Sequence, residues 1–213
     1  MTSVAILGAG RLGTVLARLA VAGGYEVRIA GSEDPKFIAL TVQTYARGAV
    51  PLAARDAIDG ADLVVLALPL HRFTELPADA LAGHIVVDAM NHWLEVDGPM
   101  PEFTDAPEGT SSVVASRLPG AQVVKALGHV GYLDLDAHGR DGRRVALGIA
   151  TDHPGAADAV ARFIDAMGFD PVIVGPLASG VALQPGSLAF GAAMTRADLE
   201  RAVSDVPRAP EIP

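Results

Sequence analysis

The chain contains no cysteine among its 213 residues, which excludes disulfide bonds and thiolate metal ligands. Aromatic residues make up 5% of the chain and charged residues 19%, whereas 50% is hydrophobic, so the composition favours a packed globular core over disorder. The longest apolar run, residues 61–70, is too short to cross a bilayer and is interrupted by Asp62 and Pro69. The first residues show neither the basic start nor the apolar segment that a signal peptide has. We therefore expect a cytoplasmic protein with no membrane partner.

The formal net charge of −9 disfavours a nucleic-acid partner, because a phosphate backbone binds basic surfaces. It does not disfavour a dinucleotide, which is bound through local backbone N–H groups. The six histidines show no metal-ligand spacing. Asp134 and Asp136 weakly resemble the start of a calcium loop, but Val145 occupies the twelfth position, where the bidentate acid would stand. We predict no metal site, and the lack of a G-x-S-x-G motif argues against hydrolysis.

Short apolar runs alternate with segments of helical periodicity, which predicts a Rossmann α/β fold, a doubly wound parallel sheet with a smaller C-terminal α/β lobe. We place the dinucleotide-binding domain at residues 1–121 and the smaller lobe, for acceptor binding or dimerisation, at residues 122–213. Predicted strands cover residues 4–7, 25–30, 61–68, 85–88, 122–127, 145–150 and 171–174. Predicted helices start at residues 11, 36, 110 and 154; loops are expected at 95–109 and 134–144, and a frayed end at 206–213.

A glycine-rich turn follows the first predicted strand and opens the first predicted helix. Its residues are Gly8, Ala9, Gly10, Arg11, Leu12 and Gly13, a G-x-G-x-x-G pattern in the βαβ context that it requires. Gly8 permits the tight turn, Gly10 lets the backbone approach a pyrophosphate, and Gly13 allows close helix packing. The helix N-terminus would then face the phosphates with free N–H groups. The alternative is a glycine-rich turn without a ligand.

The end of the second strand decides between NAD and NADP. An NAD site usually has an acidic residue there for the ribose 2′-OH, whereas this chain has Gly31 and Ser32, with Lys36 one turn later. Ser32 could donate to a 2′-phosphate and Lys36 could neutralise it, which favours NADP. Glu33 and Asp34 keep NAD open, and Ser32 and Lys36 could also be a turn residue and a solvated surface charge.

Further candidates follow the third and fourth predicted strands, at the edge where open α/β sheets bind ligands. Leu68, Pro69 and His71 follow one strand, and Asn91 and Trp93 follow the next. We expect these residues to surround a nicotinamide ring, with Asn91 binding its carboxamide. The structural alternative is that Pro69 ends a strand, His71 begins a helix and Trp93 fills a gap.

Several segments together resemble the F420-dependent NADP reductase family, which shares its dinucleotide module with metalloreductases. The resemblance extends over nearly the whole chain. The matching segments are Gly8–Gly13, Ala30–Ser32, Val65–Pro69, Lys125–Leu127, Gly168–Val172 and Gly175–Ala178. It implies reversible hydride transfer between NADP and coenzyme F420, a 5-deazaflavin co-substrate, in a homodimer. Such a transfer depends on proximity of two stacked rings rather than on a covalent catalyst. We name His129 and His71 as candidate catalytic groups for the accompanying proton.

The chain also departs from this family. Glu33 stands where relatives often have a basic residue, Gly128 replaces a common asparagine, and residues 184–186 indicate a divergent subgroup. Three other hypotheses remain: an imine or β-hydroxyacid reductase, an NADPH-dependent flavin or metal reductase, and an NADP-sensing module without catalysis. The first is disfavoured because we predict only strand, helix, strand and a short tail after residue 122.

Overall fold

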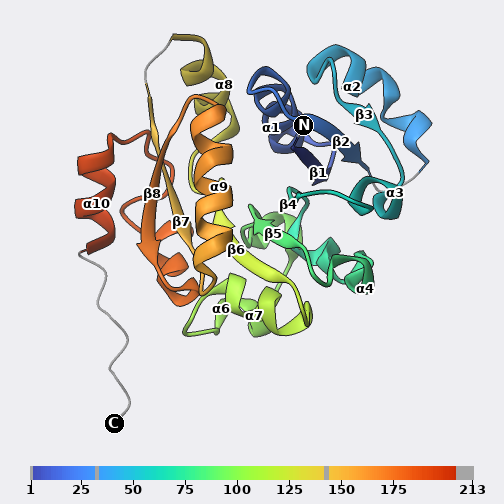
Figure 1. Cartoon of the computed structure of the whole chain (residues 1–213). Coiled ribbons are helices and arrows are strands. Elements are labelled where there is room, and N and C mark those ends of the chain that lie inside the picture. Colours follow the sequence, from blue (N-terminus) through green and yellow to red (C-terminus); the bar gives the residue numbers. More distant parts are fainter. Residues whose placement is uncertain (1, 32–33, 142–143, 205–213) are drawn as a thin grey trace.

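The computed structural model describes residues 2–31, 34–141 and 144–204 of the chain, which form one eight-stranded sheet flanked by helices (Figure 1). The strand order is β3-β2-β1-β4-β5-β6-β7-β8. The strands are β1 (Ser3–Leu7), β2 (Glu26–Ala30), β3 (Val50–Pro51), β4 (Leu63–Leu66), β5 (Ile85–Asp88), β6 (Gln122–Ala126), β7 (Ala146–Ala150) and β8 (Asp170–Gly175). This arrangement confirms the predicted Rossmann-type α/β class.

The first six strands are parallel to one another, and β7 and β8 run the opposite way. Lys125 pairs with Ala150 at the antiparallel junction, so the C-terminal strands extend the same sheet instead of forming a second one. The carboxyl ends of β1, β4, β5 and β6 therefore meet at one edge. The domain boundary at residues 121 and 122 stays a prediction.

Alternate strand residues build two apolar layers, one on each face of the sheet, as the period of two requires. Val4 and Ile6 pack with α1 and α9, whereas Ala5 and Leu7 pack with α3, α4 and α7 on the other face. The longer helices are α1 (Arg11–Ala22), α2 (Ala39–Tyr45), α7 (Thr110–Arg117), α8 (Tyr132–Asp141), α9 (Pro154–Ala166) and α10 (Arg196–Ser204). The short ones are η1 (Pro35–Phe37), α3 (Ala54–Ile58), η2 (Leu70–Glu75), α4 (Ala78–Leu81), α5 (Leu94–Asp97), α6 (Pro101–Thr104) and η3 (Leu177–Leu183).

The prediction of a loop at residues 134–144 is wrong over most of its length, because helix α8 occupies Tyr132–Asp141. Polar composition and Gly139 indicate a loop by local propensity, but tertiary contacts override it. Leu135 is fully buried in the core layer shared with α1, and Arg18 of α1 forms an ion pair with Asp136.

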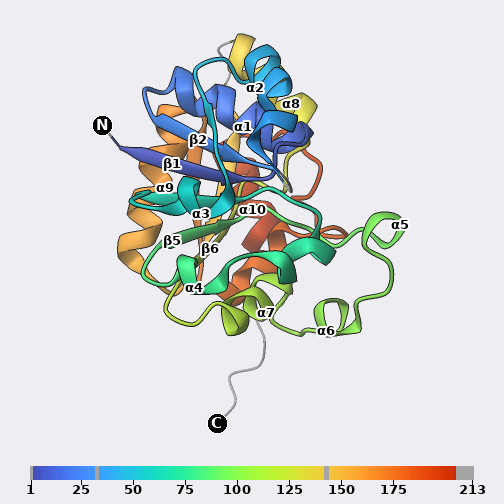
Figure 2. The same ribbon diagram turned by 90° about the vertical axis from the view of Figure 1, so that its right-hand side faces the viewer.

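Four other local predictions need correction. The single helix expected from residue 36 is η1 followed by α2, and the loop at residues 95–109 contains α5 and α6, which project from the body of the molecule (Figure 2). The two-residue strand β3 was not predicted. Helix α7 begins after Gly109 and has no side-chain cap. The short tail after β8 contains η3 and α10, and the end predicted to fray lies outside the described residues. Among the described helices, none combines the length and apolarity needed to span a membrane.

Candidate dinucleotide and acceptor site

The glycine-rich turn joins β1 to α1 at the carboxyl edge of the sheet. Gly8 has a φ of +123°, and a Cβ there would lie 2.1 Å from the carbonyl oxygen of Ala67. A Cβ on Gly13 would lie 1.8 Å from the carbonyl oxygen of Gly8, so the helix and the turn approach too closely for any side chain. Both glycines are therefore required by the fold itself.

Gly10 differs, because a Cβ there would meet no protein atom within 4 Å. Its backbone has a φ of −81°, which any residue adopts, and it is the N-cap of α1. The N–H groups of the first helical turn have no partner within the helix and carry its partial positive charge. The open space beside Gly10 thus lies at an anion-binding helix terminus, where a pyrophosphate fits.

A first cavity of about 410 Å³ lies on one side of this turn. It is bordered by Gly8, Gly31, Ile38, Leu68 and Arg72 among others, between the ends of β1, β2 and β4. This is where the adenosine half of a dinucleotide lies in a Rossmann fold. A second cavity, of about 530 Å³, lies on the other side of Gly10.

The second cavity, called the acceptor cavity below, is bordered by the segments that follow β4, β5 and β6. The two cavities share Gly10, Ala67, Leu68 and Pro69, so together they run across the carboxyl edge of the sheet. The acceptor cavity is further lined by Arg11, Leu12, Ala89, Met90, Asn91, Trp93, Val96, Gly128, His129, Val130, Gly131, Tyr132, Phe190 and Gly191. Their combined extent is suited to a dinucleotide with a second ring beside its nicotinamide.

Of the residues predicted to read a 2′-phosphate, Ser32 lies outside the described residues, and so does Glu33. Lys36 is exposed, and its Nζ lies 2.8 Å from Oδ2 of Asp34. Asp34 also accepts a hydrogen bond from the backbone N–H of Lys36, which makes it the N-cap of η1. The side-chain hydrogen bond from Lys36 lowers the pKa of Asp34. A 2′-phosphate would have to compete with this carboxylate for Lys36.

Asn91 lines the acceptor cavity, and its amide is held from both sides. Its Nδ2 donates to the carbonyl oxygen of Gly128 over 2.7 Å, and its Oδ1 accepts from Nζ of Lys125 over 3.3 Å. One amide hydrogen and one lone pair are left for a ligand such as a carboxamide. The orientation of Asn91 is therefore set before any ligand arrives.

Lys125 is the main site residue that the sequence analysis did not predict. It appeared there only as the first residue of the matching segment Lys125–Leu127. It is 1% exposed, donates to the carbonyl oxygen of Met90 and lies 4.0 Å from Oδ2 of Asp88. Asp88, fully buried, accepts hydrogen bonds from Ser111 Oγ and Met90 N. Burial lowers the pKa of Lys125, and the Asp88 carboxylate opposes that shift. A lysine inside the apolar run at residues 123–126, next to a strand that ends in an aspartate, is the signal that could have revealed this pair.

The segment after β6 turns sharply into the acceptor cavity. Leu127 has a φ of +67°, a left-handed conformation that costs a non-glycine residue roughly 1–3 kcal/mol. A Cβ on Gly128 would lie 2.5 Å from the carbonyl oxygen of Ala89, so this position is closed on the side of β5. This strained turn carries His129 to Tyr132 to the cavity wall.

His129, a predicted catalytic residue, is 1% exposed. Neither ring nitrogen has a hydrogen-bond partner of normal geometry among the described residues. Burial lowers the pKa of His129 to about 4; the backbone of Ala146 opposes this shift and Lys125 adds to it. The imidazole is therefore neutral at pH 7 and sealed from solvent.

The pKa of His129 predicts a loss of stability in mild acid. Because the unfolded histidine, with a pKa of 6.5, binds a proton before the folded one, unfolding is favoured as the pH falls from about 6.5 towards 4. The free energy of unfolding should fall by about 3 kcal/mol over this range, at about 1.4 kcal/mol per pKa unit. Urea unfolding between pH 4 and pH 7.5 measures the free energy of unfolding of the wild type and of His129→Leu. Equal pH slopes in the two proteins would contradict the prediction.

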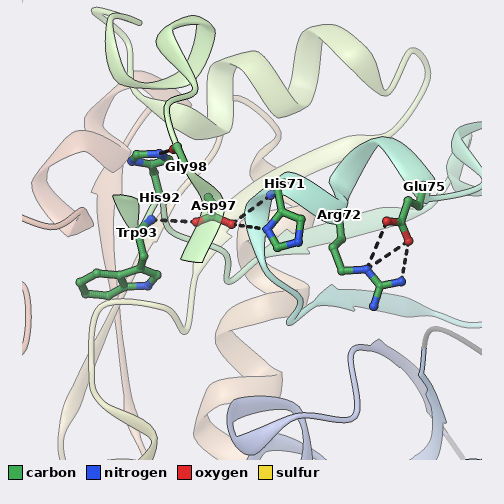
Figure 3. Close-up of polar contacts among 7 residues, drawn as sticks. All are labelled: His71, Arg72, Glu75, His92, Trp93, Asp97 and Gly98. Carbon is green, nitrogen blue, oxygen red and sulfur yellow. Dashed lines mark hydrogen bonds and ion pairs between the residues drawn. The ribbon is translucent and has the colours of Figure 1, made fainter. Parts of the chain in front are cut away.

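His71, the second predicted catalytic residue, lies in the first turn of η2 and is not among the residues that line the acceptor cavity. Its Nδ1 lies 2.8 Å from Oδ1 of Asp97, and its side chain is 43% exposed (Figure 3). The Asp97 carboxylate also accepts from the backbone N–H groups of His71 and Trp93. Burial raises the pKa of Asp97, but these hydrogen bonds and the imidazole together lower it. Asp97 thereby orients the ring and leaves Nε2 for proton exchange.

Aromatic and cationic side chains complete the acceptor cavity. The rings of Trp93 and Phe190 lie 5.6 Å apart at 58°, although these residues are far apart in the chain. Nη1 of Arg11 donates to the hydroxyl of Tyr132 over 3.0 Å and joins α1 to α8 across the cavity. Figure 3 shows the ring of Trp93 pointing away from Asp97.

The fold and these cavities are those of the Rossmann class of dinucleotide-binding proteins. Residues 3–92 match the family described as NADP oxidoreductase, coenzyme F420-dependent. This match confirms the predicted resemblance to that family over this segment. No curated protein sequence matches the chain.

Solved structures extend the similarity beyond residue 92. A hypothetical protein from Sinorhizobium meliloti is 30% identical with a TM-score of 0.78, and the match covers 91% of this chain and 95% of that one. A proposed F420-dependent NADP reductase from Arthrobacter sp. FB24 is 25% identical with a TM-score of 0.68, over 83% and 86% of the two chains. A 3-hydroxyisobutyrate dehydrogenase from Mycobacterium tuberculosis, 21% identical with a TM-score of 0.61, shares the fold; the match covers 85% of this chain but 57% of that one.

Proposed function

We propose that this protein transfers hydride between NADP(H) and a planar acceptor, the deazaflavin coenzyme F420. The observation that carries the proposal is the junction of the two cavities at Gly10 and residues 67–69. A dinucleotide whose pyrophosphate rests on the N-terminus of α1 would extend into both cavities. The family match over residues 3–92 and the Arthrobacter structure support NADP and F420 as the two reactants.

The nicotinamide, when bound, supplies or accepts the hydride, and the protein supplies position and a dry environment. The first turn of α1 would hold the pyrophosphate, and Asn91 would orient the carboxamide. Pro69, Trp93 and Phe190 would exclude water from the space between the two rings. Reduction of a deazaflavin takes up a proton in addition to the hydride, and His71, with its exposed ring, is better placed for that exchange than the sealed His129.

A single-turnover experiment tests this function. Protein in excess over NADPH is mixed with F420, and the loss of both absorption bands should proceed at one shared rate. FMN and ferric chelates are tested in parallel, because reduction of these alone would identify a flavin or metal reductase instead. Tight NADPH binding without transfer to any acceptor would indicate a sensing module.

The predicted binding of the 2′-phosphate by Ser32 and Lys36 gives a test of the choice between NADP and NAD. The double change Ser32→Ala and Lys36→Ala should weaken NADPH binding about tenfold or more relative to NADH, since a charge-assisted contact contributes roughly 1.5–3 kcal/mol. Calorimetric titration with both cofactors measures the ratio. Asp34→Asn is the matched control: it releases Lys36 from its ion pair and should strengthen NADPH binding selectively. Equal effects on the two cofactors would show that these residues only support the turn.

A bulky residue at Gly131 should separate acceptor binding from cofactor binding. Gly131 lines the acceptor cavity, and a Cβ there meets only the Asp134 carboxylate, at 3.3 Å. Gly131→Trp should lower hydride transfer at least tenfold and change the NADPH dissociation constant less than about threefold, or 0.7 kcal/mol. Gly128 is unsuitable, because a side chain there would collide with Ala89. Gly155→Trp on α9, where a Cβ meets nothing within 4 Å, is the control. Unimpaired transfer in Gly131→Trp would place the acceptor elsewhere.

A further inference from the structure

The acceptor cavity holds a single charged side chain among its described lining residues, and that side chain has a partner. It is Arg11, whose guanidinium donates to Tyr132 and lies 5.7 Å from the centre of its ring. The rest of the described lining is glycine, aliphatic or aromatic apart from Asn91 and His129, and the pKa of His129, about 4, keeps its ring uncharged. The cavity therefore offers apolar surfaces to a flat ring.

Lining residues and their neighbours in sequence expose further apolar side chains. Leu94 and Val96 of α5 are 61% and 58% exposed, Leu133 of α8 is 68% exposed, and Leu188, two residues before Phe190, is 68% exposed. Between the two α5 residues stands the exposed Glu95. Exposed apolar side chains close in sequence to a cavity lining are typical of a binding surface, and a carboxylate among them repels anions.

Two further guanidinium groups that the structure describes, those of Arg144 and Arg18, are engaged by carboxylates. Arg144 donates to Asp170 over 2.6 Å and pairs with Asp165. Arg18 pairs with Asp136. Arg143 lies outside the described residues.

We propose that the acceptor cavity recognises the ring of its substrate and does not bind an anionic tail. This inference rests on the proposed function. The substrate class is then a planar, uncharged heterocycle of deazaflavin size, so the deazaflavin without its phosphate and glutamate tail is reduced at least as efficiently as complete F420. Stacking on aromatic and apolar side chains supplies the affinity.

The experiment compares F420 with 7,8-didemethyl-8-hydroxy-5-deazariboflavin, which has the same ring system without the tail, using kcat/KM for NADPH-dependent reduction and binding by fluorescence quenching. We expect kcat/KM for the tail-free compound to equal or exceed kcat/KM for F420. Added salt should raise the value for F420 by screening repulsion and leave the other unchanged. A tenfold or greater preference for F420, the size that one charge-assisted tail contact gives, would overturn the inference and leave the proposed function standing.

Two charge variants sharpen the comparison. Glu95→Lys should raise kcat/KM for F420 severalfold and leave the tail-free compound unaffected. Asp158→Lys, on an exposed position of α9 that lines neither cavity, should affect neither compound. The change Arg143→Ala should also be neutral; a selective loss of F420 reduction in this variant would overturn the inference. Binding of the tail-free compound without hydride transfer would contradict the proposed function but support the inference, and binding of neither compound would contradict both.

Discussion

Replacement of Gly10 by valine should abolish dinucleotide binding while the protein stays folded. The position has an ordinary φ of −81°, and a Cβ there meets no protein atom within 4 Å, so the valine fits the backbone and extends into the space where the pyrophosphate would lie. We expect the NADPH dissociation constant to rise a hundredfold or more, which corresponds to about 2.7 kcal/mol. The free energy of unfolding should change by less than about 1 kcal/mol. Calorimetric titration and urea unfolding measure the two quantities.

Gly13→Ala is the contrasting variant for this experiment. Its methyl group would lie 1.8 Å from the carbonyl oxygen of Gly8, so we expect a large loss of stability together with the loss of binding. The two glycines thus separate a requirement of the ligand from a requirement of the fold. Near wild-type NADPH affinity in a folded Gly10→Val protein would end the hypothesis that this turn binds a dinucleotide.

Replacement of Lys125 by methionine should cost about 3–5 kcal/mol of stability, because it leaves the carboxylate of Asp88 buried without its cation. Methionine keeps much of the volume, so the loss reports the charge and hydrogen bonds to Met90 and Asn91 more than packing. Urea unfolding of the variant measures the cost. The Asn91 amide also loses the donor that orients it, so NADPH affinity should fall in the same variant.

Two controls identify the cause of this loss. The double variant Lys125→Met with Asp88→Asn removes both charges and should recover part of the stability, giving a clear coupling energy. Lys36→Met changes an exposed lysine and should stay within about 0.5 kcal/mol of the wild type. A cost below about 1 kcal/mol for Lys125→Met would mean that the buried pair does not stabilise the fold.

Local pattern alone was sufficient for the glycine-rich turn and for the parallel part of the fold except the two-residue strand β3, which was not predicted. The apolar runs that became β1, β5 and β6 are bounded by glycine or polar residues, and Gly8, Gly10 and Gly13 follow the first of them at a fixed spacing. These signals are local, because steric limits on a turn and the period of a strand act over a few residues. For the same reason Pro69 and Asn91 could be placed at the ligand-binding edge from strand ends alone.

Only the tertiary structure decided the features that depend on residues distant in sequence. Helix α8 forms where polarity predicted a loop, because Leu135 is buried against the α1 layer and Asp136 meets Arg18. The C-terminal strands join the first sheet through the antiparallel pairing of β6 with β7, which strand patterns cannot specify. The burial of Lys125 beside Asp88 and the meeting of Trp93 with Phe190 likewise arise from packing between separate segments, for which a single sequence carries no local signal.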